Sequence, residues 1–277
     1  MLGLSIRPPS AFAPEGLTEV HAWRDESGEV CARAYTGGGH SWIRWIGFAA
    51  FRFDASGIVA VPEREVDPGH IADLCRRSIE PLALQALGRE TLHASAVRGP
   101  SGLVLFCGPC ESGKSTLAYA LSRRGWPQFA DDSVVVDAGE RSVRALALPF
   151  GVRLRAASSA VLGDPDPHGV LDAPSTRPRP VSTSPVSRIF VLRRVDGASM
   201  SADCLDPGAA FVALLAHARS FDSVDASARQ RLLEAYLRIA AIVPVHDLAF
   251  GAGLDRLDAL LDLVESAADL RLEAASA

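Results

Sequence analysis

The sequence has no apolar run long enough to cross a bilayer, and its first residues, MLGLSIRPPSAF, lack the basic start and long apolar stretch of a secretory leader. We therefore expect a cytoplasmic protein without a membrane partner. Basic residues are also in the minority: the sequence has 28 Lys and Arg and 33 Asp and Glu, for a formal net charge of −5. The chain as a whole lacks the excess positive charge of nucleic-acid-binding proteins, so no nucleic-acid partner is expected. The net charge does not exclude a local basic groove.

Cysteine is scarce as well. The five cysteines are odd in number and scattered along the chain, which argues against a disulfide framework. The sequence does have enough apolar residues for a sizeable core: 48% of its 277 residues are hydrophobic and 22% are charged. This composition is typical of a globular protein with one large domain or two modest ones.

The N-terminal third is expected to hold a β-region followed by a helix. Between about residues 17 and 61, short β-type segments alternate with turn signals, which is the pattern of an antiparallel meander. Residues 69–88 then carry apolar side chains at helical spacing. Pro81 should kink or split that helix, because proline lacks the N–H that continues the hydrogen-bond ladder. We divide the chain into residues 1–90 and residues 91–277.

Residues 91–277 predict a mixed α/β fold. Several short strands follow one another without helices between them, which fits a mixed sheet around one strand–loop–helix unit better than a plain doubly wound sheet. Helices are expected at about 208–220, 225–242 and 254–272. Residues 163–185 are rich in Pro, Asp and Ser and have no periodicity, which indicates a long loop of the kind that contacts substrate or forms a lid.

The most informative segment is GPCESGKS, residues 108–115, which follows the apolar run LVLFC. Glycines at its first and sixth positions allow backbone N–H groups to point inward around a polyphosphate. Lys114 would place a positive charge on the β- and γ-phosphates, and the Ser115 hydroxyl is the usual ligand of the accompanying Mg²⁺. The residues expected to hold ATP are Gly108, Glu111, Ser112, Gly113, Lys114, Ser115 and Thr116.

Three further residues have side chains suited to the same chemistry. Asp131 and Asp132 follow the loop by one predicted helix and one turn, and such carboxylates can accept a proton or bind a cation. The alternative for this pair is an Asx-type turn ahead of the next strand. His93 lies upstream of the apolar run, and it is either a protonatable partner of the carboxylates or a histidine satisfied within the core.

Residues 93–136 resemble the core of HPr kinase/phosphorylase and of the wider group of HPr-kinase-related proteins. In this family a histidine opens the strand before the phosphate loop, the loop has the form GxxxxGKS, and its helix ends at an RG pair shortly before the sequence ADD. All these features stand here in the same order. The resemblance implies a P-loop core of the HPr-kinase and phosphoenolpyruvate-carboxykinase type, with ATP and Mg²⁺ as cofactors. It also implies Asp131 as general base, His93 and Lys114 as further catalytic residues, and Ser115 and Asp132 as metal ligands.

The resemblance is incomplete in two places. In the family, a glycine-rich segment after the Asp pair contains a Glu implicated in the reverse, phosphorolytic reaction, and the corresponding stretch here, ALALPFGVRLRAAS, has none. Residues 1–90 do not resemble the regulatory domain of those enzymes. The chain is more similar to divergent relatives found with peptide-tailoring systems. This makes residues 1–90 a candidate substrate-recognition region beside a catalytic domain of residues 91–277.

Taken together, these features predict an ATP-dependent kinase that phosphorylates a Ser or Thr hydroxyl of a precursor peptide, of the RiPP or lasso type, or of a small protein. Three alternatives stay open. They are an HPr(Ser) kinase/phosphorylase, a small-molecule kinase, and a non-catalytic ATP-binding protein that recruits a peptide. Homo-oligomerisation also stays open.

Overall fold

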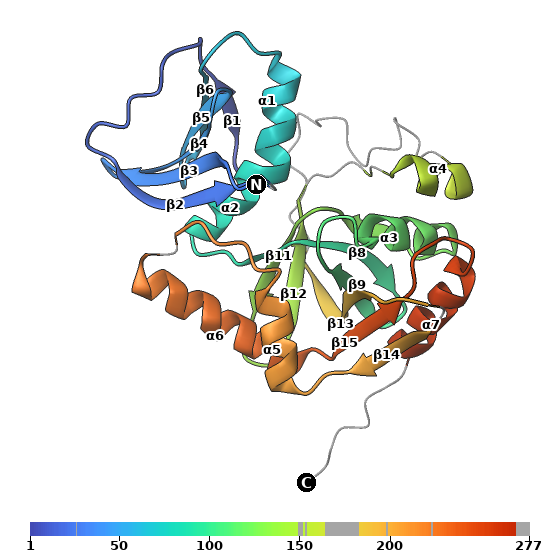
Figure 1. The fold of residues 1–277 in the computed structure, drawn as a ribbon. Helices are drawn as coiled ribbons and strands as arrows, with labels where there is room; N and C mark the ends of the chain where they lie inside the picture. Colours follow the sequence, from blue (N-terminus) through green and yellow to red (C-terminus); the bar gives the residue numbers. More distant parts are fainter. Residues whose placement is uncertain are drawn as a thin grey trace. The chain divides into compact units, whose positions relative to one another are not determined.

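The computed structural model of the protein describes residues 1–25, 27–148, 152, 154–163, 183–197, 199–222 and 224–269. The chain forms two compact units (Figure 1). The first consists of Met1–Thr91 and Arg219–Glu234, and the second of Leu92–Ala218 and Ala235–Ala277. The first unit thus includes a returning segment, residues 219–234, that the predicted division of the chain did not contain.

The first unit is built on a six-stranded sheet. Each strand from β2 to β6 pairs in antiparallel fashion with its neighbour in the sequence, which confirms the predicted meander. The short β1 adds to β6 in parallel, so the sheet is mixed and its order is β1-β6-β5-β4-β3-β2. The strands are β1 (Leu4–Ile6), β2 (Thr18–Arg24), β3 (Val30–Gly37), β4 (His40–Trp45), β5 (Ala49–Asp54) and β6 (Gly57–Pro62).

The helix predicted over residues 69–88 is split, as its proline indicated. α1 (Pro68–Leu74) continues into a five-residue π-helical turn, Cys75–Ile79, and then into α2 (Glu80–Ala86). Pro81 stands at the start of α2 and has no N–H to donate to the preceding turn, so the wider turn lies where a regular helical hydrogen bond is missing. The helical segment packs against the sheet and buries a shared core of Ile71, Ile79, Phe51, Phe53 and Phe221.

Glu80 is a buried carboxylate in this segment, only 6% exposed. Its Oε1 accepts a hydrogen bond from the Leu2 N–H at 2.8 Å, and burial raises its pKa above the ordinary glutamate value. The folded state therefore binds this proton more tightly than the unfolded state. As a result, the free energy of unfolding falls as pH rises from the ordinary pKa through the raised one.

We expect Glu80→Gln to remove this pH-dependent loss of stability, because the amide keeps an acceptor oxygen for Leu2 but cannot ionise. Thermal unfolding of both proteins at acid and neutral pH measures the effect. The variant should unfold at a higher temperature than wild type at neutral pH and show no such gain at acid pH. A stability difference that does not change with pH would contradict the assignment.

The second unit is built on a nine-stranded mixed sheet. The long strand β13 pairs with three others. It is parallel to β9, its first residues pair in antiparallel fashion with β12, and its last residues pair in parallel with β15. The carboxyl ends of β9, β13 and β15 therefore lie at one edge of the sheet, where open α/β sheets bind ligands. The strands are β7 (Thr91–Leu92), β8 (Ala94–Gly99), β9 (Gly102–Cys107), β10 (Gln128–Ala130), β11 (Val134–Ala138), β12 (Val143–Ala147), β13 (Thr183–Arg194), β14 (Met200–Cys204) and β15 (Val245–Phe250).

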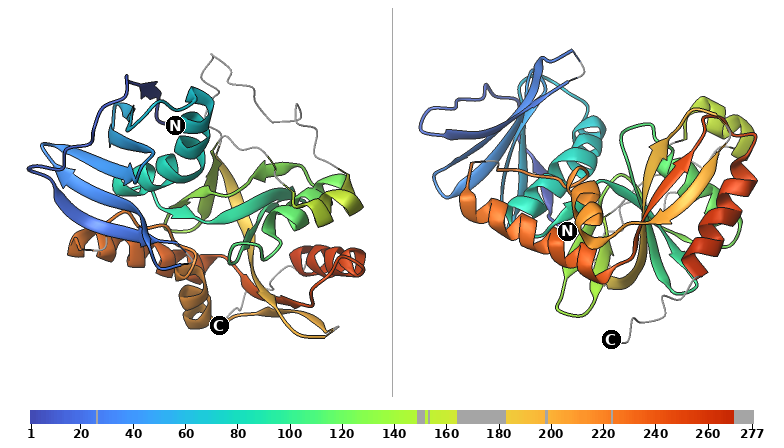
Figure 2. Two further views of the ribbon diagram at one scale, coloured as in Figure 1. Left: turned by 45° about the horizontal axis from the view of Figure 1, so that its top comes forward. Right: turned by 60° about the horizontal axis from the view of Figure 1, so that its bottom comes forward.

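The remaining helices are α3 (Lys114–Arg123), α4 (Ala156–Leu162), α5 (Pro207–Leu215), α6 (Ala226–Ile242) and α7 (Leu257–Asp269). The predicted helices at about 208–220, 225–242 and 254–272 correspond to α5, α6 and α7. α3 and α7 cover the same face of the second sheet (Figure 2). Their apolar side chains bury Phe106, Phe190 and Leu192 in a shared core.

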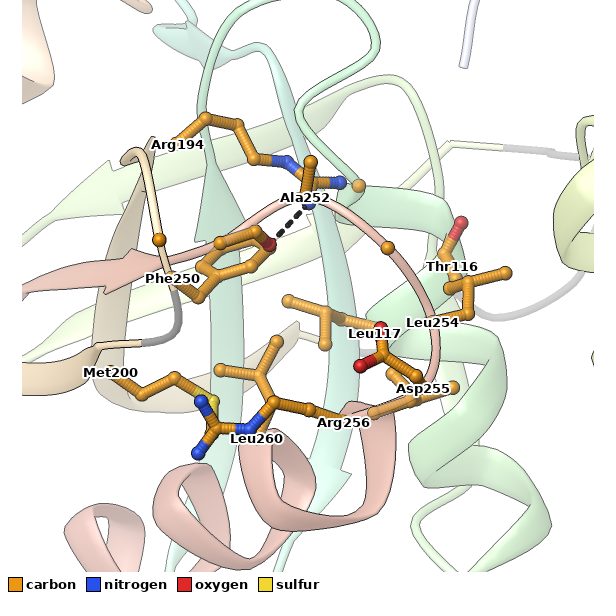
Figure 3. A pocket seen from close by; sticks show the side chains of 15 residues that line it. Thr116, Leu117, Arg194, Met200, Phe250, Ala252, Leu254, Asp255, Arg256 and Leu260 are labelled. Carbon is orange, nitrogen blue, oxygen red and sulfur yellow. Dashed lines mark hydrogen bonds between the residues drawn. The ribbon is translucent and has the colours of Figure 1, made fainter.

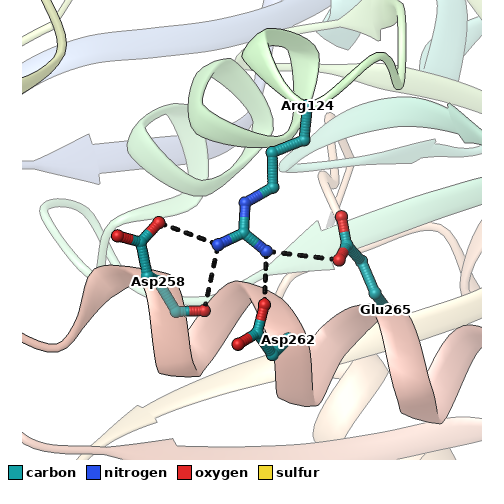
Figure 4. A network of polar contacts seen from close by, with 4 residues as sticks. All are labelled: Arg124, Asp258, Asp262 and Glu265. Carbon is teal, nitrogen blue, oxygen red and sulfur yellow. Dashed lines mark hydrogen bonds and ion pairs between the residues drawn. The ribbon is translucent and has the colours of Figure 1, made fainter.

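A polar network joins the end of α3 to α7 (Figure 4). The Arg124 guanidinium donates to Asp258 at 2.8 Å, to Asp262 at 2.6 Å and to Glu265 at 3.2 Å. The three acceptors lie on one face of α7 at spacings of four and three residues, so one guanidinium contacts two successive turns of the helix. An isolated surface ion pair contributes little, but a network around one arginine is the arrangement in which such contacts add stability. The network thus joins the C-terminal end of α3, the helix that follows the glycine-rich loop, to α7.

Two predicted segments extend beyond the described part of the chain. Residues 164–182, most of the predicted loop, and residues 270–272, the end of the last predicted helix, lie outside the described residues. Among the described helices, none is long and apolar enough to cross a membrane. All five cysteines are free.

Candidate functional site

The segment GPCESGKS forms a tight turn between β9 and α3. Gly108 has φ 157° and Gly113 has φ 108°, in the region that L-residues with side chains avoid. A Cβ at Gly108 would lie 2.6 Å from Ser112 Oγ and 3.1 Å from Leu192 Cβ, so no side chain fits there. Glu111 is also left-handed, with φ 67°, and its carboxylate forms an ion pair with Arg155. The glycines are therefore required by this loop, and Glu111 is held in a strained conformation of the kind found at functional sites.

Lys114 is the first residue of α3 and the only lysine in the sequence. The side chain is 7% exposed, and Nζ donates to the carbonyl oxygens of Gly108 at 2.9 Å and Pro109 at 2.8 Å. Burial lowers its pKa, while the neighbouring thiols and carboxylates act in the opposite direction. An ammonium group has three donors, so after these two bonds one N–H remains for an anion at the N-terminus of the helix.

A second donor lies inside the loop. The Ser112 hydroxyl is buried and makes no hydrogen bond within the part of the chain that the structure describes. A buried hydroxyl normally finds a partner, and an exception calls for an explanation such as a bound ion. Together with Lys114 and the turned backbone of the loop, this hydroxyl suits the oxygen atoms of a phosphate group.

Asp131 lies directly against the start of α3. It follows β10 and is 6% exposed, and its Oδ1 accepts hydrogen bonds from Ser95 Oγ at 2.5 Å and Ser115 Oγ at 2.8 Å. Burial raises the pKa of this carboxyl, the hydroxyl of Ser95 opposes the shift, and the charge of Asp132 adds to it. The structure thus joins Ser115, a predicted metal ligand, to Asp131, the predicted general base.

Asp132 adopts an unusual backbone conformation at the next position. Its φ is 63°, the left-handed region, and its side chain is half-buried. The Asp132 carbonyl oxygen accepts a hydrogen bond from His93 Nδ1 at 2.8 Å. That bond requires the proton on Nδ1 and therefore sets the tautomer of a neutral His93 ring. His93 thus fixes the backbone at Asp132, next to the buried Asp131.

His217 is a neighbour of the site that the sequence did not indicate. The His93 N–H donates to the His217 carbonyl oxygen at 2.9 Å, and Leu92 forms a β-bridge with Ala218. Burial lowers the pKa of His217, and the charge of Lys114 lowers it further, so the imidazole lies within electrostatic range of the ammonium group. The sequence around His217 has no motif that would mark it as a site residue. Its proximity to Lys114 arises only when the chain folds.

The remaining predicted loop residue, Thr116, lies in the first turn of α3, and its hydroxyl is 3.0 Å from Ser158 Oγ of α4. In the described residues, no group of three or more His, Cys, Asp or Glu side chains is arranged to hold a metal ion. Mg²⁺ commonly binds through one or two carboxylates together with substrate phosphates and water. A hydroxyl beside a carboxylate, as in Ser115 and Asp131, fits a magnesium ion that arrives with a nucleotide rather than a resident metal.

Comparisons with known proteins give a weak structural likeness. No protein-family model matches the sequence, and no curated protein matches it. Among solved structures, an HPr(Ser) kinase/phosphatase from Coxiella burnetii is similar, with 14% sequence identity over 64% of this chain and 95% of that chain, and a TM-score of 0.33. A likeness of this extent establishes neither family nor activity, and the functional conclusion depends on the site itself.

Proposed function

We propose that the protein is a P-loop kinase that transfers the γ-phosphoryl group of ATP to a Ser or Thr hydroxyl of a peptide or small protein. The observation that carries this proposal is the contact between Ser115 Oγ and the buried Asp131 carboxylate, 2.8 Å apart beside the Lys114 ammonium. A phosphate loop, a hydroxyl and a carboxylate in contact are the parts that P-loop enzymes use to hold a nucleotide and its Mg²⁺.

The residues of the loop fit this pair of cofactors. Lys114, Ser112 and the loop amides supply donors for phosphate oxygens, and Ser115 and Asp131 supply oxygen ligands for Mg²⁺. When bound, Mg·ATP supplies the phosphoryl group and neutralises part of the charge that develops during transfer. The protein itself positions the nucleotide and the acceptor hydroxyl and stabilises the charge of the transferring phosphoryl group.

The contacts favour a different assignment of the two aspartates from the one that the resemblance implies, which makes Asp131 the general base and Asp132 a metal ligand. Asp131 is buried and accepts hydrogen bonds from two hydroxyl groups, one of them that of Ser115, which suits a ligand of Mg²⁺. Asp132 is half-buried, and its backbone is in the left-handed region. We therefore assign Asp132 to the general base, which accepts the proton of the acceptor hydroxyl, and His93 to the positioning of Asp132 through its backbone carbonyl.

A peptide acceptor is favoured by the sheet of the first unit. β2 is the last strand in its order, and an extended chain can add main-chain hydrogen bonds to such an edge strand. The alternatives differ in the acceptor or in the absence of transfer. An HPr-type kinase would phosphorylate a folded protein, a small-molecule kinase would ignore peptides, and a recruitment protein would bind ATP without turning it over.

The test is transfer from radiolabelled Mg·ATP. The purified protein is incubated with a degenerate library of Ser- and Thr-containing peptides, with HPr, and with a metabolite mixture in separate reactions. We expect label on Ser or Thr of the peptides and none on a library in which both are replaced by Ala. Label only on HPr or only on metabolites would favour the corresponding alternative, and ATP binding without transfer to any acceptor would favour the recruitment protein.

We also expect transfer to be one-way. The reverse reaction would take a phosphorylated serine and inorganic phosphate to serine and pyrophosphate, and the segment ALALPFGVRLRAAS lacks the Glu that the resemblance associates with it. Incubating a phosphorylated product with the protein, Mg²⁺ and inorganic phosphate should yield no pyrophosphate in an enzyme-coupled assay. Rapid pyrophosphate release would assign the protein to the bifunctional HPr type.

A further inference from the structure

A pocket opens beside the glycine-rich loop in the second unit (Figure 3). Its volume is about 110 Å³, and it shares Gly113 and Thr116 with the loop and the first turn of α3. Its other walls come from the end of β13, the start of β14, the residues after β15 and the start of α7. These segments meet because β9, β13 and β15 are parallel, so the pocket and the phosphate-binding loop lie at the same edge of the sheet.

Arg194 lies between the loop and the pocket. Its guanidinium carbon is 4.5 Å from the centroid of the Phe250 ring, and its NH1 donates to the Gly251 carbonyl oxygen at 2.9 Å. A Cβ at Gly113 would lie 3.3 Å from Arg194 NH2, which brings the guanidinium against the loop backbone. The planar cation is therefore fixed on one side by an aromatic ring and on another by the residue that precedes Lys114.

The rest of the lining is mainly apolar, with one carboxylate and a second guanidinium, that of Arg256. Leu117, Met200, Leu254 and Leu260 present aliphatic or thioether side chains, and Asp255 adds an acceptor at the rim of the same space. Pockets for whole drug-sized ligands are usually about 300–1,000 Å³. A cavity of about 110 Å³ is too small for a complete nucleotide but suits one flat ring system.

We propose that this pocket binds the purine base of a nucleoside triphosphate whose phosphates lie on residues 108–115. Arginine guanidinium planes and aromatic rings stack on nucleobases, and a carboxylate accepts hydrogen bonds from the ring or amino N–H groups of a purine. The proposal rests on the proposed function, since it presupposes phosphate binding by the loop. It adds that the protein recognises the nucleoside as well as the phosphates.

The first experiment compares ligands on the full-length protein. Isothermal titration in Mg²⁺ measures ATP, GTP, UTP and inorganic triphosphate. We expect both purine nucleotides to bind about 10- to 100-fold more tightly than inorganic triphosphate, the range that stacking of one base provides, with UTP weaker than the purines. Equal affinity for all four ligands would overturn the base pocket and leave the phosphate loop intact. Failure of all four to bind would overturn both proposals.

The second experiment changes the pocket without the loop. Ala252 is exposed and lines the pocket, so Ala252→Trp should fill the space without disturbing the core. Arg194→Met removes the planar cation and keeps an apolar stem. Arg98→Met is the matched control, because Arg98 stacks on Phe129 at 4.7 Å and does not line the pocket.

Both pocket variants should lose about 10-fold or more in ATP affinity while their affinity for inorganic triphosphate stays near the wild-type value. Arg98→Met should change neither, and thermal unfolding verifies that all three variants fold. Unchanged ATP affinity in Ala252→Trp would overturn the proposal. Equal losses for ATP and inorganic triphosphate in Arg194→Met would assign that arginine to the phosphates and would overturn its role in base recognition.

Discussion

Replacing Lys114 with alanine is expected to remove most of the affinity for Mg·ATP. The ammonium group is fixed by two loop carbonyls at 2.8 and 2.9 Å and is directed into the glycine-rich turn. Loss of a charge-assisted hydrogen bond costs about 1.5–3 kcal/mol, which corresponds to roughly a 10- to 150-fold weaker complex. Calorimetry with Mg·ATP measures the change.

The control for this variant is Cys110→Ala, which alters an exposed side chain of the same loop and should bind nearly as well as wild type. Equal nucleotide affinity in wild type and Lys114→Ala would remove the phosphate-loop assignment and the kinase proposal with it.

The single lysine permits a second measurement on the unaltered protein. An amine-reactive reagent has only the Lys114 side chain and the terminal amine to modify. Burial lowers the pKa of Lys114, which enlarges the fraction of neutral, reactive amine at a given pH but also restricts access. Mg·ATP should slow modification at Lys114 and not at the terminal amine, as followed by peptide mass spectrometry. Equal rates with and without Mg·ATP would contradict phosphate binding at this residue.

The second large effect separates the two aspartates. Asp132→Asn should keep Mg·ATP binding nearly intact and lower the rate of transfer to a hydroxyl acceptor by roughly 10² to 10⁴, as loss of a general base does. Asp131→Asn retains an oxygen that can accept from Ser95 and Ser115, so the fold should persist. It loses the negative charge beside Ser115, and transfer should then require a much higher Mg²⁺ concentration.

Titration of Mg²⁺ in a transfer assay distinguishes these outcomes. Asp137→Asn, an exposed change on the following strand, is the matched control and should leave both parameters near wild type. A loss of transfer in Asp131→Asn that added Mg²⁺ does not restore, together with near-normal transfer in Asp132→Asn, would return the role of general base to Asp131, as the resemblance implies.

Local chemistry alone determined several parts of this protein. The turn at residues 108–113 follows from its glycines, because only a residue without Cβ fits at Gly108, and an apolar run on one side and a helical pattern on the other set its place. The split before Pro81 follows from a missing N–H. The meander between residues 17 and 61 follows from alternation and turn residues, which act over a few positions. Each of these depends on neighbours in the chain.

The tertiary structure decided the rest, because it depends on residues that are distant in the sequence. Which aspartate contacts Ser115 depends on Ser95 and on a hydrogen bond between His93 and Asp132, residues that different strands and loops carry. The returning segment 219–234 and the parallel pairing of β13 with both β9 and β15 have no signal in their own residues, since a strand does not encode its partner. The pocket joins Gly113 to Arg194 and Phe250, which share no local pattern. Spacing along the chain can indicate which residues carry chemistry, but only the packing of separate strands determines which of them meet.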